Sequence, residues 1–215
     1  MHAGIDDARF WDRAARKYAR DPIKDLAGYE RTLERTAQLL RGSDTVLELG
    51  CGTGTTALRL APQVARVVAT DVSQEMIAIA REKAIAETCP NAEFTVASAD
   101  HLIEAEGTFD AVLAFNLLHL LADRAAVLAR VDRLLKPGSL FISKTPCLSE
   151  MNPLIRWAVP VARLVGKAPY VSFFTAAELE ADIARAGFSV VERARHGSQR
   201  KDPRIFIVVR KPASF

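Results

Sequence analysis

A glycine-rich segment at residues 50–54 is the part of the sequence best suited to binding a ligand. It reads Gly50-Cys51-Gly52-Thr53-Gly54 and follows directly on the apolar run Thr45–Leu49. Glycines allow a sharp turn and let a ligand approach the backbone without a Cβ in the way. A helix that begins straight after the loop turns its free N–H groups toward that ligand. The segment therefore predicts a binding loop between a strand and a helix.

Two acidic residues indicate which ligand the loop binds. Asp71 ends the next apolar run, twenty-one residues after Gly50, where a carboxylate can accept hydrogen bonds from ribose hydroxyls. Glu48 precedes the loop, and Thr55 stands where a GxGxxG fingerprint would carry its third glycine. A carboxylate beside the loop disfavours a phosphate and suits a cation. S-adenosylmethionine (SAM) has no phosphate and carries a sulfonium and an ammonium, so the pattern favours SAM over NAD.

The elements that must hold these residues alternate between strands and helices. Helices are predicted over Thr55–Gln63, after the cap Ser73, and over Asp123–Leu135. The predicted strands are Thr45–Leu49, Arg66–Thr70, Glu93–Ala97, Phe109–Phe115 and Ser139–Lys144. This alternation predicts an α/β fold, a Rossmann-like doubly wound sheet that is mostly parallel and has helices on both faces. Such sheets bind ligands at the carboxyl ends of their strands.

The two ends of the chain add a cap and an edge to this core. Two helices are predicted within residues 8–41, separated at Asp21-Pro22, and a last helix and an antiparallel hairpin follow residue 174. We expect a single domain of 215 residues. Its parts are a helical cap (1–43), the SAM-binding core (44–145), a lid or substrate segment (146–174), and the last helix and hairpin (175–215).

Composition limits the class of protein. With 49% hydrophobic residues the chain can build one sizeable core, and a net charge of +3 is too weak to indicate nucleic acid. The three cysteines show no CxxC pairing, which favours a reducing compartment. The polar N-terminus is no signal peptide, and no apolar run reaches the ~18 residues of a membrane span. We expect a cytoplasmic protein without a metal site.

The segment Val46–Gly54 resembles the glycine-rich motif of class I SAM-dependent methyltransferases. The tail from Phe174 to Phe188 is similar to that of the small-molecule branch, which includes ubiquinone- and menaquinone-biosynthesis-type enzymes. Further matching segments follow in order: Asp71–Met76, Ala97–Leu102, Phe109–His119 and Leu134–Ser139. The resemblance implies methyl transfer from SAM to a small, apolar, aromatic or lipid-like acceptor, with S-adenosyl-L-homocysteine as the other product.

The same resemblance implies a role for each site residue. Plain alternatives remain open for three of them: core packing for Met76, a helix cap for Asp100 and helix packing for Tyr18. The resemblance implies that the loop around the methionine half of SAM is shaped by Gly50, Gly52 and Gly54 and oriented by Glu48, and that Cys51 lies in it without chemistry of its own. It implies that Asp71 holds the ribose, that the adenine is sandwiched by Val72 and Met76, and that Asp100 accepts from the adenine amino group, with His101 beside it. It also implies that the Phe115 carbonyl lies near the ammonium and that Tyr18 caps the carboxylate.

Catalysis needs few specialised groups, because methyl transfer from a sulfonium has a good, neutral leaving group and depends mainly on positioning. His119 and Tyr29 are the candidate bases. The plain alternatives are a buried histidine bonded to the backbone and a tyrosine that packs a helix. The chain reads Phe115-Asn116-Leu117-Leu118 after its fourth strand, without the Asn/Asp-Pro-Pro-aromatic sequence of exocyclic-amine methyltransferases. No nucleic-acid partner is expected. The rival functions are an RNA methyltransferase and a SAM-binding protein without turnover.

Residues 151–167 are apolar, with Arg156, Arg163 and Lys167 spaced to share one helical face and Pro160 inside. Three interpretations stay open: a core helix, a lid over an apolar substrate, or a helix that contacts a membrane surface. The oligomeric state is not indicated by the sequence.

Overall fold

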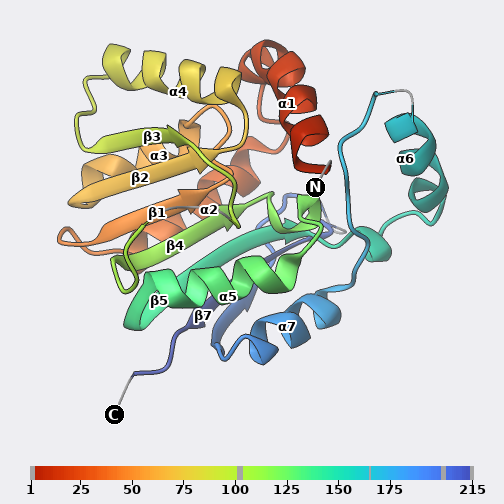
Figure 1. Ribbon diagram of the computed structural model, residues 1–215. Coiled ribbons are helices and arrows are strands. Elements are labelled where there is room, and N and C mark those ends of the chain that lie inside the picture. The colour runs from red at the N-terminus through yellow and green to blue at the C-terminus, as the bar shows by residue number, and fades with distance from the viewer. Residues whose placement is uncertain (1–2, 101–103, 165, 200–201, 214–215) are drawn as a thin grey trace.

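Seven strands form one sheet at the centre of the molecule (Figure 1). The computed structural model describes residues 3–100, 104–164, 166–199 and 202–213. The strand order is β3-β2-β1-β4-β5-β7-β6; the first five are mutually parallel, and β7 is antiparallel to both of its neighbours. The strands are β1 (Thr45–Leu49), β2 (Arg66–Asp71), β3 (Ala92–Val96), β4 (Phe109–Phe115), β5 (Leu135–Pro146), β6 (Ser189–Ala194) and β7 (Arg204–Arg210).

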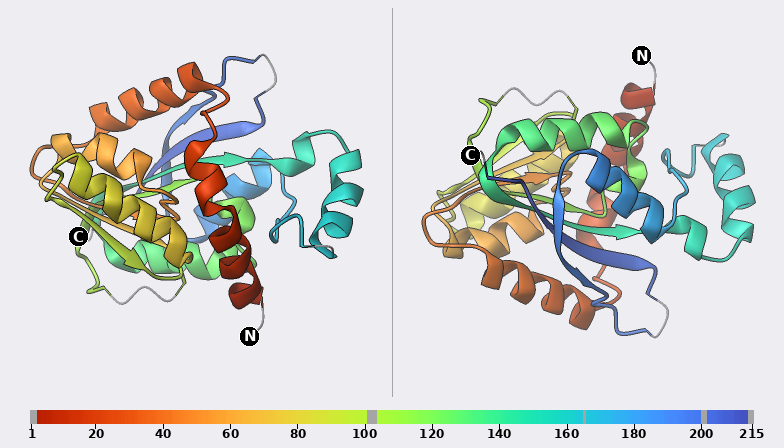
Figure 2. Two further views of the ribbon diagram at one scale, coloured as in Figure 1. Left: turned by 90° about the horizontal axis from the view of Figure 1, so that it is seen from above. Right: turned by 90° about the horizontal axis from the view of Figure 1, so that it is seen from below.

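Helices cover both faces of the sheet (Figure 2). One core cluster joins the sheet to α2 (Leu26–Leu39), α3 (Thr55–Leu60) and α4 (Gln74–Ala86). The other joins it to α5 (Arg124–Leu134) and α7 (Ala176–Arg185). Because β1, β2 and β4 are buried on both faces, their central residues are mostly apolar. The predicted mostly parallel Rossmann-like sheet with a C-terminal antiparallel hairpin is confirmed.

Local sequence explains where the helices begin. Ser73 and Thr175 cap α4 and α7 by accepting hydrogen bonds from the third residue along, and the Thr175 cap is completed by Glu178 as a capping box. Asp123 caps α5 in the same way. These short-range bonds fix the ends of the helices that flank the sheet.

Two predicted elements differ from the structure. The helix predicted over Thr55–Gln63 changes to a 3-10 turn at Ala61, because Pro62 has no N–H to continue the α-helical pattern. The strand predicted over Ser139–Lys144 begins earlier, since Leu135 already pairs with Phe109 across an irregular register.

Two helices lie outside these layers. The helix α1 (Ala3–Arg20) packs beside α4, close to the carboxyl ends of the parallel strands, and α6 (Leu154–Leu164) stands away from the sheet (Figures 1 and 2). The chain that returns from α6 contacts α1, because the Tyr170 N–H donates to Asp7 at 3.1 Å. No residue of α6 is buried. The interpretation of residues 151–167 as a core helix is therefore wrong.

Candidate cofactor and acceptor site

The glycine loop has the strained backbone that its sequence predicts. Gly50, Gly52 and Gly54 all have positive φ angles, of 66°, 54° and 75°. A Cβ on Gly54 would lie 2.7 Å from the Phe94 ring and 2.8 Å from Ala80, whereas a Cβ on Gly52 would meet nothing nearer than Tyr18, at 3.8 Å. Gly54 therefore allows α3, β3 and α4 to pack closely, and Gly52 leaves the inner side of the loop open.

Asp71, at the carboxyl end of β2, is tied to the loop. Its Oδ2 accepts from the Gly52 N–H and its Oδ1 from the Ser73 N–H, both at 2.9 Å. Burial raises the pKa of Asp71, against the lowering effect of these backbone hydrogen bonds. Each carboxylate oxygen keeps lone-pair capacity for a further donor. The residue can hold the loop and still accept a ribose hydroxyl.

Glu48 is the most unusual group in the site. The residue is 2% exposed, and its Oε2 has no hydrogen-bond partner among the described residues. Burial raises its pKa to about 8, opposed by a backbone hydrogen bond from Ala57 and reinforced by the charge of Asp71. An unpaired buried acceptor is costly unless something satisfies it. A cation bound nearby would favour the ionised form of this carboxyl, whereas a phosphate would favour the protonated form. The group is therefore compatible with the cationic SAM.

Helix α1 supplies one wall of the site. The Tyr18 ring lies over Gly52. The residue as a whole is 53% exposed, and the partial burial of its hydroxyl together with the charges of Asp71 and Glu48 raises the pKa of that hydroxyl. Its role in capping the carboxylate of the ligand stays a prediction. Asp12, from the same helix, accepts from the Ser73 hydroxyl at 2.6 Å and from the Glu75 N–H at 3.2 Å. Sequence reasoning missed Asp12, because nothing distinguishes it from the other acids of a polar helix.

The predicted adenine-binding residues follow β2 and β3. Met76 is buried in the first turn of α4, and Val72 is half-buried. Asp100 accepts a hydrogen bond from the Ser98 hydroxyl. His101 lies outside the described residues. Their roles in adenine binding stay predictions.

The carboxyl end of β4 adjoins the glycine loop. Phe115 is the last residue of this strand, and Asn116 has a positive φ of 53°, which asparagine tolerates better than most residues. Leu117 then packs so closely over Gly50 that a Cβ there would lie 2.8 Å from its Cδ1. The Cys51 side chain belongs to the core, where burial raises its pKa well above the ordinary value. Only the backbone of Cys51 therefore belongs to the loop.

His119 lies in a 3-10 turn, Leu118–Leu120, just beyond β4. Its backbone carbonyl accepts from the Ser172 N–H at 2.8 Å. Its ring Nδ1 is buried and has no partner among the described residues, and burial lowers the pKa of the imidazole to about 4. The ring is thus neutral at physiological pH and is not the backbone-bonded histidine of the plain alternative.

Tyr29 lies on α2, and its hydroxyl is 3.2 Å from the Thr56 hydroxyl in the first turn of α3. Burial raises the pKa of this phenol, although the Thr56 bond lowers it. The contact supports a packing role, and the catalytic role stays a prediction.

Lys83 is a second residue that the sequence did not indicate. From α4 it donates to the Thr53 hydroxyl at 3.1 Å and to the Thr55 hydroxyl at 3.0 Å. These bonds brace the start of α3 from outside the loop. Lys83 is one of several charged residues on α4, so nothing in the sequence distinguishes it as a residue that contacts the loop.

Comparison with known proteins gives consistent similarities. A family model described as "Methyltransferase domain" matches residues 46–138. The chain is 32% identical over 162 residues to a ubiquinone biosynthesis O-methyltransferase of Xanthomonas axonopodis pv. citri, covering 72% of this chain and 66% of that protein. It is 35% identical over 147 residues to the protein of the same name from Xylella fastidiosa, covering 66% and 59%. The chain thus spans no more than about two thirds of these curated relatives.

Solved structures share the fold. A SAM-dependent methyltransferase from Mesorhizobium loti superposes with a TM-score of 0.72 at 19% identity, covering 86% of this chain and 98% of that one. A Haloferax volcanii protein solved in complex with the Trm112 methyltransferase activator gives 0.73 at 19% identity, covering 98% of each chain. At these identities the likeness establishes the fold alone.

Proposed function

The chain belongs to the class I SAM-dependent methyltransferase family, and from this premise we propose that it methylates a hydroxyl of a small, apolar, aromatic or lipid-like molecule. Its cofactor is SAM. The observation that carries the cofactor part of the proposal is the tie between Asp71 and the glycine loop, beside the buried carboxyl of Glu48. The names of the curated relatives, ubiquinone biosynthesis O-methyltransferases, support oxygen as the acceptor atom.

We assign the cofactor and the acceptor to different segments of the chain. Residues 44–145 hold the cofactor, while residues 1–43 and 146–174 enclose the acceptor. We also propose that residues 151–167 contact a lipid surface, because an apolar acceptor partitions into membranes. The cysteines Cys51, Cys89 and Cys147 are all free, which supports work in the reducing cytoplasm.

SAM, when bound, would supply an electrophilic methyl group on a cationic sulfonium, with the neutral thioether of S-adenosyl-L-homocysteine as the leaving group that keeps the electrons of the carbon–sulfur bond. Asp71 would hold the ribose, and the positive charge of the cofactor would favour the ionised form of Glu48. Binding of the acceptor would have to expose the buried, unpaired Nδ1 of His119, which would then accept the hydrogen bond of the acceptor hydroxyl and take its proton as the new carbon–oxygen bond forms. A neutral His119 suits this place, because a charged imidazole would repel the sulfonium.

Calorimetric titration with SAM, followed by a methyl-transfer assay on phenols and catechols, tests the proposal. Asp71→Ala should weaken SAM binding by about 1–3 kcal/mol through lost hydrogen bonds. Asp21→Ala, which removes an exposed acid beside Lys17, should bind SAM normally. Absence of SAM binding by the unaltered chain would refute the cofactor assignment, and binding without turnover on any acceptor would favour a non-catalytic SAM-binding protein.

A further inference from the structure

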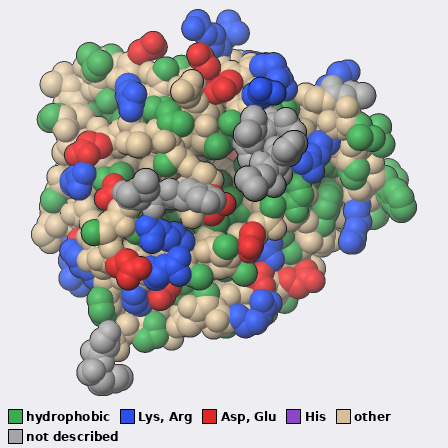
Figure 3. Space-filling view, viewed as in Figure 1, with side chains coloured by type: hydrophobic (Ala, Val, Ile, Leu, Met, Phe, Trp, Pro, Cys, Tyr) green, Lys and Arg blue, Asp and Glu red, His purple; other side chains and the backbone are tan. Residues whose placement is uncertain are grey.

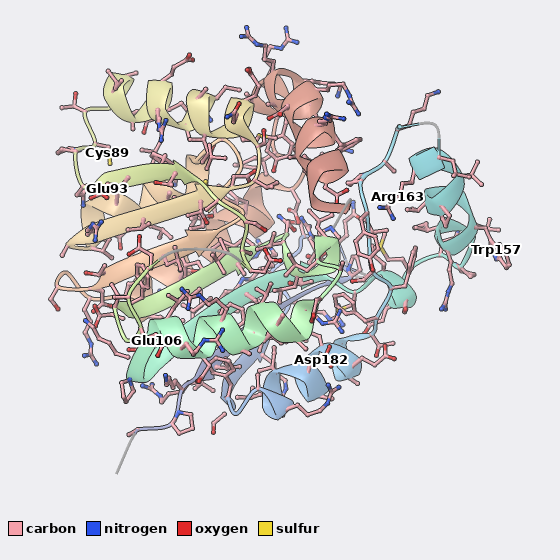
Figure 4. The ribbon with its side chains drawn as sticks, in the orientation of Figure 1. Cys89, Glu93, Glu106, Trp157, Arg163 and Asp182 are labelled. Carbon is pink, nitrogen blue, oxygen red and sulfur yellow. The ribbon has the colours of Figure 1, made fainter. Side chains whose placement is uncertain are left out.

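Helix α6 carries apolar side chains on the side that faces away from the protein. We call Leu154, Trp157, Val161 and Leu164 the outer face; their spacing of three, four and three residues places them along one side of the helix. Their exposed fractions lie between 63% and 87%. Figure 3 shows hydrophobic side chains gathered at this margin of the molecule, and Figure 4 shows Trp157 pointing outward. A contiguous exposed apolar face of this kind marks an interaction site.

The opposite side of α6 is basic. The Arg163 guanidinium lies 5.0 Å from the centre of the Tyr170 ring, and that of Arg156 lies 5.9 Å from the Phe173 ring. Figure 4 shows Arg163 between α6 and the returning chain. A cavity of about 790 Å³ lies between them, lined by these four residues, by Val159 and by Leu164, which stands at the edge of the outer face and borders the cavity as well. The polarity of α6 is thus the reverse of what a helix covering a core requires.

The charge of this segment has one sign. Residues 151–173 contain Arg156, Arg163 and Lys167 and no aspartate or glutamate. In the part of the chain that the structure describes, none of these three forms a salt bridge, whereas Arg193 and Arg195 are paired with Glu180 and Glu150. The segment therefore presents an uncompensated charge of +3 beside an apolar face. Its chemical complement is a surface that is apolar within and anionic outside.

A second copy of the chain matches this surface less well. A two-fold contact through the outer face would bury the apolar side chains of both copies, but it would leave Arg156 and Arg163 without an anionic partner on the far side of each helix. A membrane span is not the explanation either, since no described helix is both long enough and apolar enough to cross a bilayer.

We propose that α6 docks on an anionic lipid bilayer, with the outer face inserted among the acyl chains at the headgroup boundary. Arg156, Arg163 and Lys167 would then meet lipid phosphates, since long basic side chains extend toward the interface. In the structure the guanidinium groups of Arg156 and Arg163 lie over the Phe173 and Tyr170 rings, and docking would turn them from these rings toward the phosphates.

Docking has a consequence for the acceptor site. The chain that returns from α6 reaches Ser172, whose N–H donates to the His119 carbonyl at 2.8 Å. A lipid-bound α6 therefore holds the acceptor site close to the bilayer, where a lipid-like acceptor collects. This use of docking rests on the proposed function, whereas binding of vesicles requires neither SAM nor turnover.

Flotation with vesicles tests the docking. We expect the chain to float with vesicles of phosphatidylcholine containing phosphatidylglycerol, and to bind pure phosphatidylcholine at least tenfold more weakly. Trp157→Ser/Leu164→Ser should lose at least tenfold in binding. The matched control is Ile85→Ser, since Ile85 is 81% exposed on α4, at another part of the surface. Arg156→Gln/Arg163→Gln should reduce binding to anionic vesicles alone, compared with the control Lys24→Gln.

Titration of every variant with SAM separates the two proposals. Unchanged SAM affinity with lost flotation in the α6 variants is the expected result. If the unaltered chain binds SAM but ignores anionic vesicles, docking is refuted and the proposed function stands. If it sediments as a dimer that Trp157→Ser/Leu164→Ser dissociates, without vesicle binding, the outer face is a protein interface and the lipid proposal is wrong.

Discussion

The buried carboxyl of Glu48 makes the stability of the ligand-free chain depend on pH. Its pKa is raised to about 8 in the folded chain, against about 4.3 in an unfolded one. Between these values the folded state binds one more proton than the unfolded state, so the free energy of unfolding falls as pH rises. The contribution is fully present below pH 4.3 and is lost by about pH 8.

Glu48→Gln removes this titration and keeps the shape of the side chain. Between pH 6 and pH 8 the unaltered chain should lose about 2 kcal/mol of unfolding free energy relative to the variant. Urea unfolding at the two pH values measures the difference. Parallel pH profiles for the two proteins would show that Glu48 is not the buried acid described above.

His119 gives a prediction about turnover. His119→Asn should leave SAM affinity unchanged and lower kcat by 10²- to 10⁴-fold, the range typical of a general base. Tyr29→Phe removes the other candidate hydroxyl and should alter kcat less than threefold, because that hydroxyl is engaged by Thr56. Near-normal turnover by His119→Asn would end the proposed role, and a large loss in Tyr29→Phe would transfer it to Tyr29.

At the scale of elements, alanine substitutions at the loop glycines should affect stability and SAM affinity differently. Alanine at a left-handed position costs about 1–2 kcal/mol wherever it is placed. Gly54→Ala should cost about 1–3 kcal/mol more, because its Cβ would overlap Phe94 and Ala80. Gly52→Ala should cost only the strain but weaken SAM binding, since its Cβ would enter the open side of the loop.

Gly107→Ala is the control, because Gly107 has a φ of 63° and open space around its added Cβ. Thermal unfolding and SAM titration of the three variants give the comparison. We expect Gly52→Ala and Gly107→Ala to melt alike but to differ in SAM affinity. Equal melting of Gly54→Ala and Gly107→Ala would contradict the packing role of Gly54.

The elements that the sequence predicted well are those with local signals. The loop and Asp71 belong to a strand–turn–helix unit whose glycine and carboxylate spacing follows from backbone geometry, so their contact at 2.9 Å was predictable. Asp12 was not, because its bonds to Ser73 and Glu75 join residues more than sixty positions apart. Periodicity identified α6 as a helix but could not show which side would face the protein, since that depends on the returning chain.

At the scale of the whole molecule, stability is unevenly distributed. The sheet and its five flanking helices share two buried clusters, whereas α6 contributes no buried residue. Local opening is cheapest where few apolar contacts are lost. Trypsin should therefore cleave at Arg156, Arg163 or Lys167 first, and the nicked protein should still bind SAM.

Mass spectrometry of the early fragments and a SAM titration of the nicked protein check this. Arg124 is the internal reference, because its side chain is paired with Asp182 and stacked on Phe174. Early cleavage at Arg124, or loss of SAM binding on nicking at α6, would contradict the described distribution of stability.

The place of β7 in the sheet bears on how the chain is made. The ribosome releases β6 before β7, yet β7 lies between β5 and β6 and pairs with both. Until β7 emerges, the nascent chain keeps an open edge on β5 and a loose β6, and exposed strand edges invite pairing with other chains. Biosynthesis therefore leaves this half of the sheet to be closed last, by insertion of a strand rather than by addition at the margin.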